Sequence, residues 1–418
     1  MARGNVAQAQ LEYGERETVL DGRYSWARLV ASLVLATVGN VGLWSVILVL
    51  PEVQAEFAVD RGDASLAYTA TMIGFAVGNL LLGRAVDRFG ITVCIVGAAV
   101  ALGAGYALAA VSEGLWQFAV LHAGLIGLGA SATFAPLIAD ISHWFDRQRG
   151  FAVAITASGN YLAGVVWPMA LKDVLAADGW RSAYLVIAIV CVSVMIPLAL
   201  ALRRRPLHVS AAGAVPVPPR QAIDLSPRTL QWLLVAAGVG CCVAMSMPQV
   251  HIVAYSADLG YGVAVGAQML SLMLLGGVAS RILSGFVADL IGGVRTLLIG
   301  SVLQFLALLF YIPFDGLASL YVVSLIFGLA QGGIVPCYAI IVREYLPARE
   351  AGQRVGLVLM STVMGMALGG WMSGAIYDLT ASYQAAFLNG IAFNLVNVAI
   401  MLFVLWRTRG PTTAPAAA

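Results

Sequence analysis

The chain has 418 residues, of which 61% are hydrophobic and 11% are charged, and its formal net charge is +2. A soluble domain carries about 25% charged residues, so this composition excludes an ordinary soluble enzyme. A bilayer crossing needs about 20 apolar residues, so a chain with a mean hydropathy of +0.90 can hold about a dozen crossings. We expect an all-α membrane protein with many spans and no nucleic-acid partner.

Apolar runs between polar breaks predict twelve membrane-spanning helices. They lie at residues 26–50, 64–83, 91–111, 115–139, 150–171, 183–202, 229–254, 265–287, 296–313, 317–342, 355–377 and 385–406. The longest interior polar break separates the sixth span from the seventh. The predicted parts are a tail at 1–25, a six-helix bundle at 26–202, a central loop at 203–228, a second six-helix bundle at 229–406 and a tail at 407–418.

The basic residues predict the orientation. With the N-terminus inside, 19 of the 23 fall in cytoplasmic segments, Arg28 among them, and only Arg61, Lys172 and Arg181 fall on the other side. This asymmetry is a positive-inside signal, so both termini and the central loop are expected to be cytoplasmic. The first 22 residues hold no apolar run of the kind that a secretory signal needs. We expect the inner (plasma) membrane of the cell as the location.

Motifs for enzymatic chemistry are missing from the sequence. There is no phosphate-binding loop, zinc signature or nucleophile elbow, so we expect no enzyme, no cofactor and no metal site. All five cysteines, which lack metal-ligand spacing, are expected to be apolar packing residues. They are Cys94, Cys191, Cys241, Cys242 and Cys337.

The chain carries an internal duplication. The pattern Gly-x-x-x-Asp-x-x-Gly follows the second span at 83–90 and the eighth span at 285–292, and the two aspartates are 289 − 87 = 202 residues apart. A second echo, 180–184 and 383–387, has an offset of 203. Two parallel halves are typical of transporters with a substrate site between the halves, near the bilayer midplane.

Residues 83–90, GRAVDRFG, resemble the signature loop of the major facilitator superfamily, and the duplicated halves and central loop agree with this resemblance. It implies two six-helix bundles, alternating access and cytoplasmic latches, since a carboxylate is stabilised near a helix N-terminus and an arginine can bridge neighbours. A simple topological stop signal is the alternative. The expected gating residues are Asp87, Arg88, Arg147, Asp289 and Arg354.

Three stretches resemble the monocarboxylate porters and the bacterial oxalate/formate exchangers. They are 21–26 (DGRYSW), 248–260 (PQVHIVAYSADLG) and 281–289 (RILSGFVAD). In the comparison with these families, their span-one lysine falls near Trp44, their span-eight aspartate on Gly277 and the exchangers' second cation near Thr362. One central positive charge favours a monoanion over a dicarboxylate, and proton coupling is not assigned by the resemblance.

Arg281 is the exceptional charge, because it lies about two helical turns, or roughly 12 Å, inside the eighth span from the cytoplasmic loop. An arginine near mid-bilayer is costly to insert, so it should face water or a partner. Its planar fork suits a carboxylate substrate. The alternative is a structural pair with Asp140 or with backbone carbonyls.

Polar and aromatic residues inside other spans are candidate partners of the substrate, since hydroxyl and amide groups can donate to a carboxylate. Helix-to-helix hydrogen bonding is the alternative for each of them. His251 and Asp140 are candidate proton sites, and His251 could equally be a gate residue. The predicted substrate-binding set is Arg281, Asn40, Trp44, Tyr68, Asn160, Tyr161, His251, Tyr338 and Thr362.

These observations predict a monomeric secondary transporter that carries a small organic monocarboxylate, such as lactate or pyruvate, by proton symport or anion exchange. The alternative is an exporter of drugs or other organic anions from the same superfamily. A receptor with a transporter fold would need an added soluble domain, for which the tails are too short.

Overall fold

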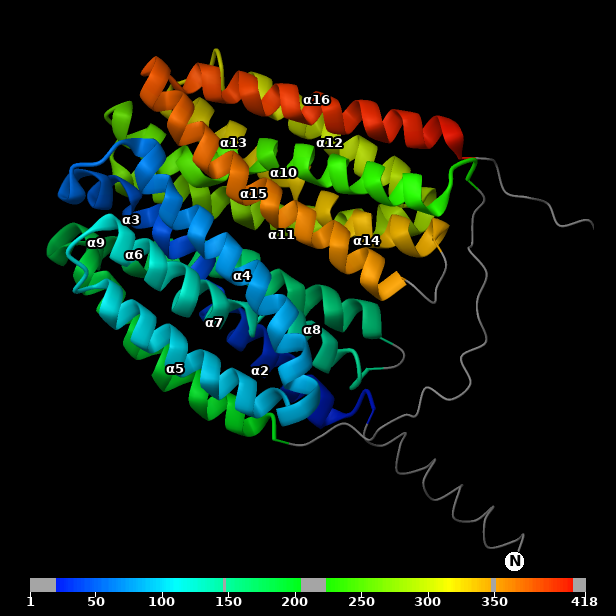
Figure 1. Ribbon diagram of the computed structural model, residues 1–418, viewed down its shortest axis with the longest axis horizontal. Helices are drawn as coiled ribbons and strands as arrows, with labels where there is room; N and C mark the ends of the chain where they lie inside the picture. The colour runs from blue at the N-terminus through cyan, green and yellow to red at the C-terminus, as the bar shows by residue number, and fades with distance from the viewer. Residues whose placement is uncertain (1–19, 146–147, 204–222, 347–350, 409–418) are drawn as a thin grey trace, which may run out of the picture.

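The computed structural model describes residues 20–145, 148–203, 223–346 and 351–408 (Figure 1). These residues form helices, and the one β-type pairing among them is an isolated bridge between Ile223 and Thr408. Most of the predicted tails and central loop, and the predicted gating residue Arg147, lie outside the described residues.

The N-terminal half contains helices from Arg23 to Ala201. The first span is broken at Asn40, and the fourth contains a π-helical turn followed by a break near Thr133. The elements are α2 (Arg23–Gly39), α3 (Val41–Phe57), α4 (Arg61–Phe89), α5 (Ile91–Ala109), α6 (Leu115–Leu121), η1 (His122–Gly127), α7 (Leu128–Ser131), α8 (Ala135–Ile141) and α9 (Arg149–Ala201).

The C-terminal half contains helices from Pro227 to Arg407. Its tenth predicted span is broken between Gln331 and Ile334, near Pro336. The elements are α10 (Pro227–Asp258), α11 (Val263–Ile291), α12 (Gly293–Phe310), α13 (Leu317–Gln331), α14 (Ile334–Tyr345), α15 (Ala351–Thr380) and α16 (Tyr383–Arg407).

Eleven helical segments of the described chain are long and apolar enough to cross a membrane. The longest, α9, has 53 residues and bends at Gly179, whose φ of 74° is non-helical. A straight helix of that length would measure about 80 Å, far more than the roughly 30 Å hydrocarbon core. Division of α9 at Gly179 would give two crossings in place of one, and the count of twelve stays a prediction.

The duplication predicted from two short motifs extends over most helix ends. Helix α4 begins and ends 202 residues before α11 (263 − 61 and 291 − 89), and α9 begins 202 residues before α15 (351 − 149). Gly90 and Gly292, which occupy equivalent positions after α4 and α11, have the same left-handed φ of 85°. The bend at Gly179 corresponds to Ala381, in the turn between α15 and α16, which also has a positive φ.

Each half is held together by glycines where helices cross. A Cβ added at Gly328 on α13 would lie 1.9 Å from the Met273 carbonyl oxygen of α11, and one added at Gly74 on α4 would lie 2.0 Å from the Ala123 carbonyl oxygen. Small residues at such crossings permit close backbone contact between membrane helices. In both cases the two helices belong to the same half, so these contacts make each half a tightly packed unit.

We expect Gly328→Val to reduce the yield of folded protein severely, because its side chain would need space that the α11 backbone occupies. The matched control is Gly97→Val on α5, where an added Cβ has no neighbour within 4 Å. Fluorescence-detected size exclusion of the two variants measures the difference. Equal monodisperse yields would contradict the packing argument.

The two halves meet along two seams. In one seam α4 packs on α15, and in the other α9 packs on α11. Hydrogen bonds between the halves cross both seams, from Thr69 Oγ1 to the Ala367 carbonyl and from Ser271 Oγ to the Val165 carbonyl. Because the duplication relates α4 to α11 and α9 to α15, the two seams are equivalent to each other.

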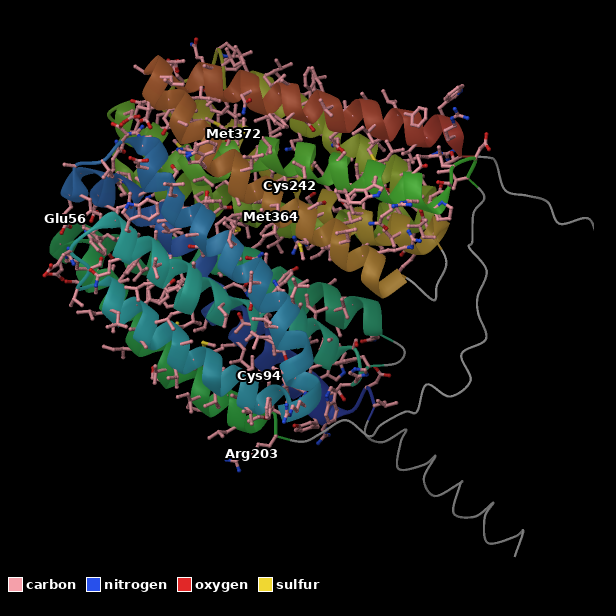
Figure 2. All side chains as sticks on the ribbon, in the orientation of Figure 1. Glu56, Cys94, Arg203, Cys242, Met364 and Met372 are labelled. Carbon is pink, nitrogen blue, oxygen red and sulfur yellow. The ribbon has the colours of Figure 1, made fainter. Side chains whose placement is uncertain are left out.

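The molecule has two distinct ends, which Glu56 and Arg203 mark in Figure 2. After the orientation predicted from the basic residues, we call the end that carries Glu56 and Arg61 the outer end and the end that carries Arg203 and Asp289 the inner end. The ribbons of the two halves are close together at the outer end and spread apart toward the inner end (Figure 1). All the charged contacts between the halves in the described chain lie at the outer end, apart from those of Arg281.

Candidate functional site

Arg281 bridges the two halves. Its Nη1 donates to the Ala157 carbonyl of α9 at 2.9 Å, and its Nε donates to the Gly332 carbonyl of its own half at 3.4 Å. The Gly332 carbonyl is available because Pro336, four residues later, has no N–H to donate to it. The guanidinium is partly buried, and no carboxylate of the described residues lies within 4 Å of it.

An aromatic ring lies against this cation. The Arg281 guanidinium carbon lies 4.2 Å from the centre of the Tyr161 ring, a geometry in which the ring quadrupole stabilises the charge. The ring fits there because Gly277 has no side chain, and a Cβ at that position would lie 2.9 Å from the ring. At the position where the resemblance places an aspartate, Gly277 thus leaves room for a cation–π contact.

Two further predicted residues continue this group along α9. Trp44 Nε1 on α3 donates to the carbonyl and to the side-chain oxygen of Asn160, at 2.8 and 3.1 Å. Since the indole nitrogen can only donate, the amide nitrogen of Asn160 must point away from it. That amide nitrogen and Nη2 of Arg281 donate no hydrogen bond to a described side chain or carbonyl within 3.5 Å. Arg281, Tyr161, Asn160 and Trp44 form what we call the anchor cluster.

Three of the other predicted binding residues make hydrogen bonds within their own half. Asn40 donates to the Ala36 and Thr133 carbonyls at the break in the first span. Thr362 donates to the Leu359 carbonyl, and Tyr338 donates to Asn397 inside the C-terminal core. The structure does not bring these three residues into contact with Arg281. Tyr68 lies in the α4–α15 seam, where its ring packs against Gly370.

Asp140 forms an ion pair with Arg28 and not with Arg281. Its two carboxylate oxygens accept from Nε and Nη2 of Arg28, both at 2.8 Å, and Arg28 is only 2% exposed. Arg28 is therefore a buried, paired charge, although it is counted among the basic residues of the cytoplasmic segments, and the alternative that Asp140 pairs with Arg281 is wrong. A carboxylate bound on both oxygens by arginine is also a poor proton carrier, which weighs against Asp140 as a proton site.

The structure describes only part of the predicted inner latches. Arg88 and Asp289 are exposed and form no ion pair with a described residue, and the side chain of Asp87 lies outside the described part. Arg354 donates to the Pro227 carbonyl at 3.3 Å. The carboxylate at the N-terminus of α12 belongs to Glu344, which accepts from the Gly293 N–H at 3.1 and 3.2 Å. A latch role for the five gating residues stays a prediction.

The outer end carries a charged cluster that sequence reasoning missed. Arg61 on α4 forms a two-pronged ion pair with Asp258 on α10. Asp378 on α15 accepts from the backbone N–H groups of Arg61 and Gly62 at 2.9 and 2.6 Å. All three side chains lie at span ends, where charges are ordinary. The sequence feature that could have indicated this cluster is Arg61, because it is one of the few basic residues on the predicted outer side.

His251 is completely buried next to this cluster. Its Nε2 lies 2.8 Å from the Gly370 carbonyl, and its Nδ1 lies 3.2 Å from the Tyr383 hydroxyl. The Tyr383 hydroxyl also accepts from Arg61 Nη1 at 2.9 Å. His251 therefore contacts the outer cluster and makes no hydrogen bond to a residue of the anchor cluster, which favours the gate alternative over direct substrate contact.

Comparison with known proteins agrees with this architecture. The family model of the Major Facilitator Superfamily matches residues 32–319 and 252–418. The chain belongs to this superfamily. It is a multi-pass membrane transporter of a family whose members move small solutes.

The relatives of this superfamily member include monocarboxylate transporters and fungal efflux proteins. Monocarboxylate transporter 13 of Bos taurus is 25% identical over 81% of this chain and 78% of its own length. The agnestins efflux protein of Paecilomyces divaricatus is 23% identical over 84% of this chain and 80% of its own. A bacterial homologue of the human lysosomal transporter Spinster, solved in an inward-facing and occupied conformation, has a TM-score of 0.72 at 14% identity and covers 94% of this chain and 99% of its own. That structural likeness shows the fold.

Proposed function

We propose that this protein is a secondary transporter of a small organic monocarboxylate, with Arg281 as the anchor of the anion. The observation that carries the proposal is a cation held between the two halves by backbone carbonyls and a tyrosine ring, with no carboxylate partner among the described residues. Carbonyls orient a guanidinium without neutralising it, so the positive charge stays available for a ligand.

The anchor cluster suits one carboxylate and a small apolar body. Nη2 of Arg281 and the amide nitrogen of Asn160 supply donors, while the Tyr161 and Trp44 rings, 6.4 Å apart between centroids, supply apolar walls. A second carboxylate would have no cation of its own in this cluster. A monoanion is therefore favoured, and the monocarboxylate transporters among the relatives support this substrate class.

The position of Arg281 also suits alternating access. It contacts Ala157 of the first half and Gly332 of the second, so a substrate bound there would touch both halves and follow their relative movement. We infer a monomer in the inner membrane with cytoplasmic termini. Proton symport and anion exchange are both compatible with one uncompensated cation.

An exporter of larger organic anions is the second candidate, supported by the fungal efflux proteins among the relatives. The two functions differ in the size of the ligand that the anchor cluster admits. A broad substrate range with little dependence on Arg281 would favour the exporter.

A thermal-shift panel on the purified protein tests the proposal. Lactate, pyruvate and similar acids should raise the apparent Tm, because a ligand that binds only the folded state stabilises it by mass action. Succinate and oxalate test the charge argument, and neutral amides of the same acids serve as matched controls. Stabilisation by bulky amphipathic compounds alone would contradict the monocarboxylate assignment.

A further inference from the structure

The outer cluster is an unassigned set of charged residues that joins the two halves. Arg61 reaches from α4 to Asp258 on α10, and Asp378 reaches from α15 to the first N–H groups of α4. A carboxylate is stabilised at a helix N-terminus by the free N–H groups and by the helix dipole. The C-terminal half thus supplies both the ion-pair partner of Arg61 and the cap of the helix on which it lies.

Aromatic rings enclose the same guanidinium. The Arg61 guanidinium carbon lies 4.2 Å from the Tyr377 ring centre and 5.6 Å from that of Tyr383. Arg61 is 7% exposed, so its contacts are shielded from solvent. Separation of the α4–α15 seam at this end would break the ion pair, the cap and the cation–π contacts together.

The hydrogen bonds that connect Arg61 to His251 have a fixed direction. The Gly370 carbonyl can only accept, so Nε2 of His251 carries the hydrogen in that bond. In a neutral imidazole Nδ1 is then an acceptor, and it takes the Tyr383 hydroxyl hydrogen. The Tyr383 oxygen accepts from Arg61 Nη1. The chain of donors therefore runs from Arg61 through Tyr383 and His251 to Gly370.

A proton on Nδ1 of His251 conflicts with this arrangement. Nδ1 would become a donor, and the Tyr383 hydroxyl hydrogen would lose the acceptor that it has in this buried site. The charged and titratable groups around His251 are Arg61 on α4, Asp258 and Tyr255 on α10, Tyr377 and Asp378 on α15, and Tyr383 on α16. The carboxylates are already engaged by Arg61, so the added charge would chiefly disturb the bond between Arg61 and Tyr383.

We infer that Arg61, Asp258 and Asp378 form the outer gate of this transporter, and that protonation of His251 favours the open gate. This inference assumes the proposed transport function, but it does not depend on which substrate is carried. Its sign follows from linkage: the closed gate binds one proton fewer, so closure is favoured at high pH and is lost as the pH falls. Opening of the gate toward the outside would then accompany proton uptake at His251.

A cysteine reporter beneath the gate tests the inference. Ser65 lies one turn below Arg61 and is completely buried against α15, so Ser65→Cys should react with a maleimide only when the gate opens. Asp63→Cys, which is exposed at the same end, provides the reference rate and cancels the pH dependence of the reagent. The measured quantity is the ratio of the two labelling rates in purified protein, with the parent chain as the background.

We expect this ratio to rise by up to about tenfold per pH unit as the pH falls from about 8 to about 5.5, the range in which histidine titrates. His251→Gln keeps one donor and one acceptor but cannot be protonated, so its ratio should stay low at every pH. Arg61→Gln should raise the ratio at every pH. The matched control is Arg181→Gln, since Arg181 pairs with Glu56 at the same end within one half, and it should leave the ratio unchanged.

The outcomes separate the two parts of the inference. A ratio that does not change in Arg61→Gln would overturn the gate. A wild-type ratio that does not depend on pH, or a dependence that persists in His251→Gln, would overturn the role of His251 and would assign any pH effect to the carboxylates. Labelling needs no substrate, so these results are independent of the monocarboxylate assignment. The His143→Ala variant, at an exposed histidine, controls for general effects of histidine loss.

Discussion

Uptake of labelled lactate or pyruvate by proteoliposomes is expected to fall by about two orders of magnitude when Arg281 is replaced by alanine. Hydrogen bonds to charged groups contribute about 1.5–3 kcal/mol each, and 2.7 kcal/mol corresponds to a factor of about 100. Arg281→Lys should retain part of the activity, because lysine keeps the charge but lacks the planar fork that can hold a carboxylate on both oxygens. Initial rates well below saturation measure the effect.

The control for this prediction is Arg228→Ala, at an exposed arginine near the start of α10. It should transport at the wild-type rate. Size exclusion of each variant checks that a loss of uptake is not a loss of folded protein. If Arg281→Ala carried the monocarboxylates as fast as wild type, the anchor would be wrong, and the exporter would become the better proposal.

Removal of either member of the Arg28–Asp140 pair should strongly destabilise the protein. The pair is buried, and loss of one partner from such a pair typically costs about 3–5 kcal/mol because the other charge remains without compensation. Asp140→Ala removes the carboxylate from the buried Arg28 guanidinium and leaves it beside the Tyr24 hydroxyl, the Leu202 carbonyl and the Trp144 ring, none of which carries a negative charge. We expect a clear decrease in the apparent Tm for Asp140→Ala and for Arg28→Ala.

The double variant Arg28→Met with Asp140→Leu provides the comparison. It removes both charges and keeps most of the buried volume, so its apparent Tm should exceed that of either single variant. Arg407→Ala, which breaks the exposed pair with Asp224, should change the Tm little. Additive losses in the double variant would show that the two side chains do not act as a pair.

Much of the fold was predictable because a membrane-spanning helix can be recognised in the sequence as a long apolar run. The ends were not, since hydropathy stops at the first polar residues whereas backbone hydrogen bonding continues, as in α4, which runs to Phe89 instead of ending at 83. The breaks near Asn40 and Thr133 depend on tertiary contacts. A pattern of single residues does not contain those contacts.

The candidate site was predicted only in part, because its contacts also depend on the tertiary structure. A lone cation in an apolar run identifies Arg281, but its partners are backbone carbonyls, which every residue carries. The burial and pairing of Arg28 were missed because Asp140 is 112 residues away in sequence. The outer gate was missed because each of its charges, taken alone, looks like an ordinary interfacial residue. Only their arrangement across the two halves reveals a common role.

The two seams began as copies of one interface, since α4 with α15 repeats α11 with α9. They have since diverged in chemistry. The α4–α15 seam carries the helix cap from Asp378, next to the ion pair between Arg61 and Asp258 of α10, whereas the α9–α11 seam carries a guanidinium on a tyrosine ring. The repeat thus supplies two equivalent contact surfaces, of which one carries the charges of the proposed outer gate and the other the proposed anion anchor. A transporter with strictly symmetrical seams would have to place both tasks on the same residues.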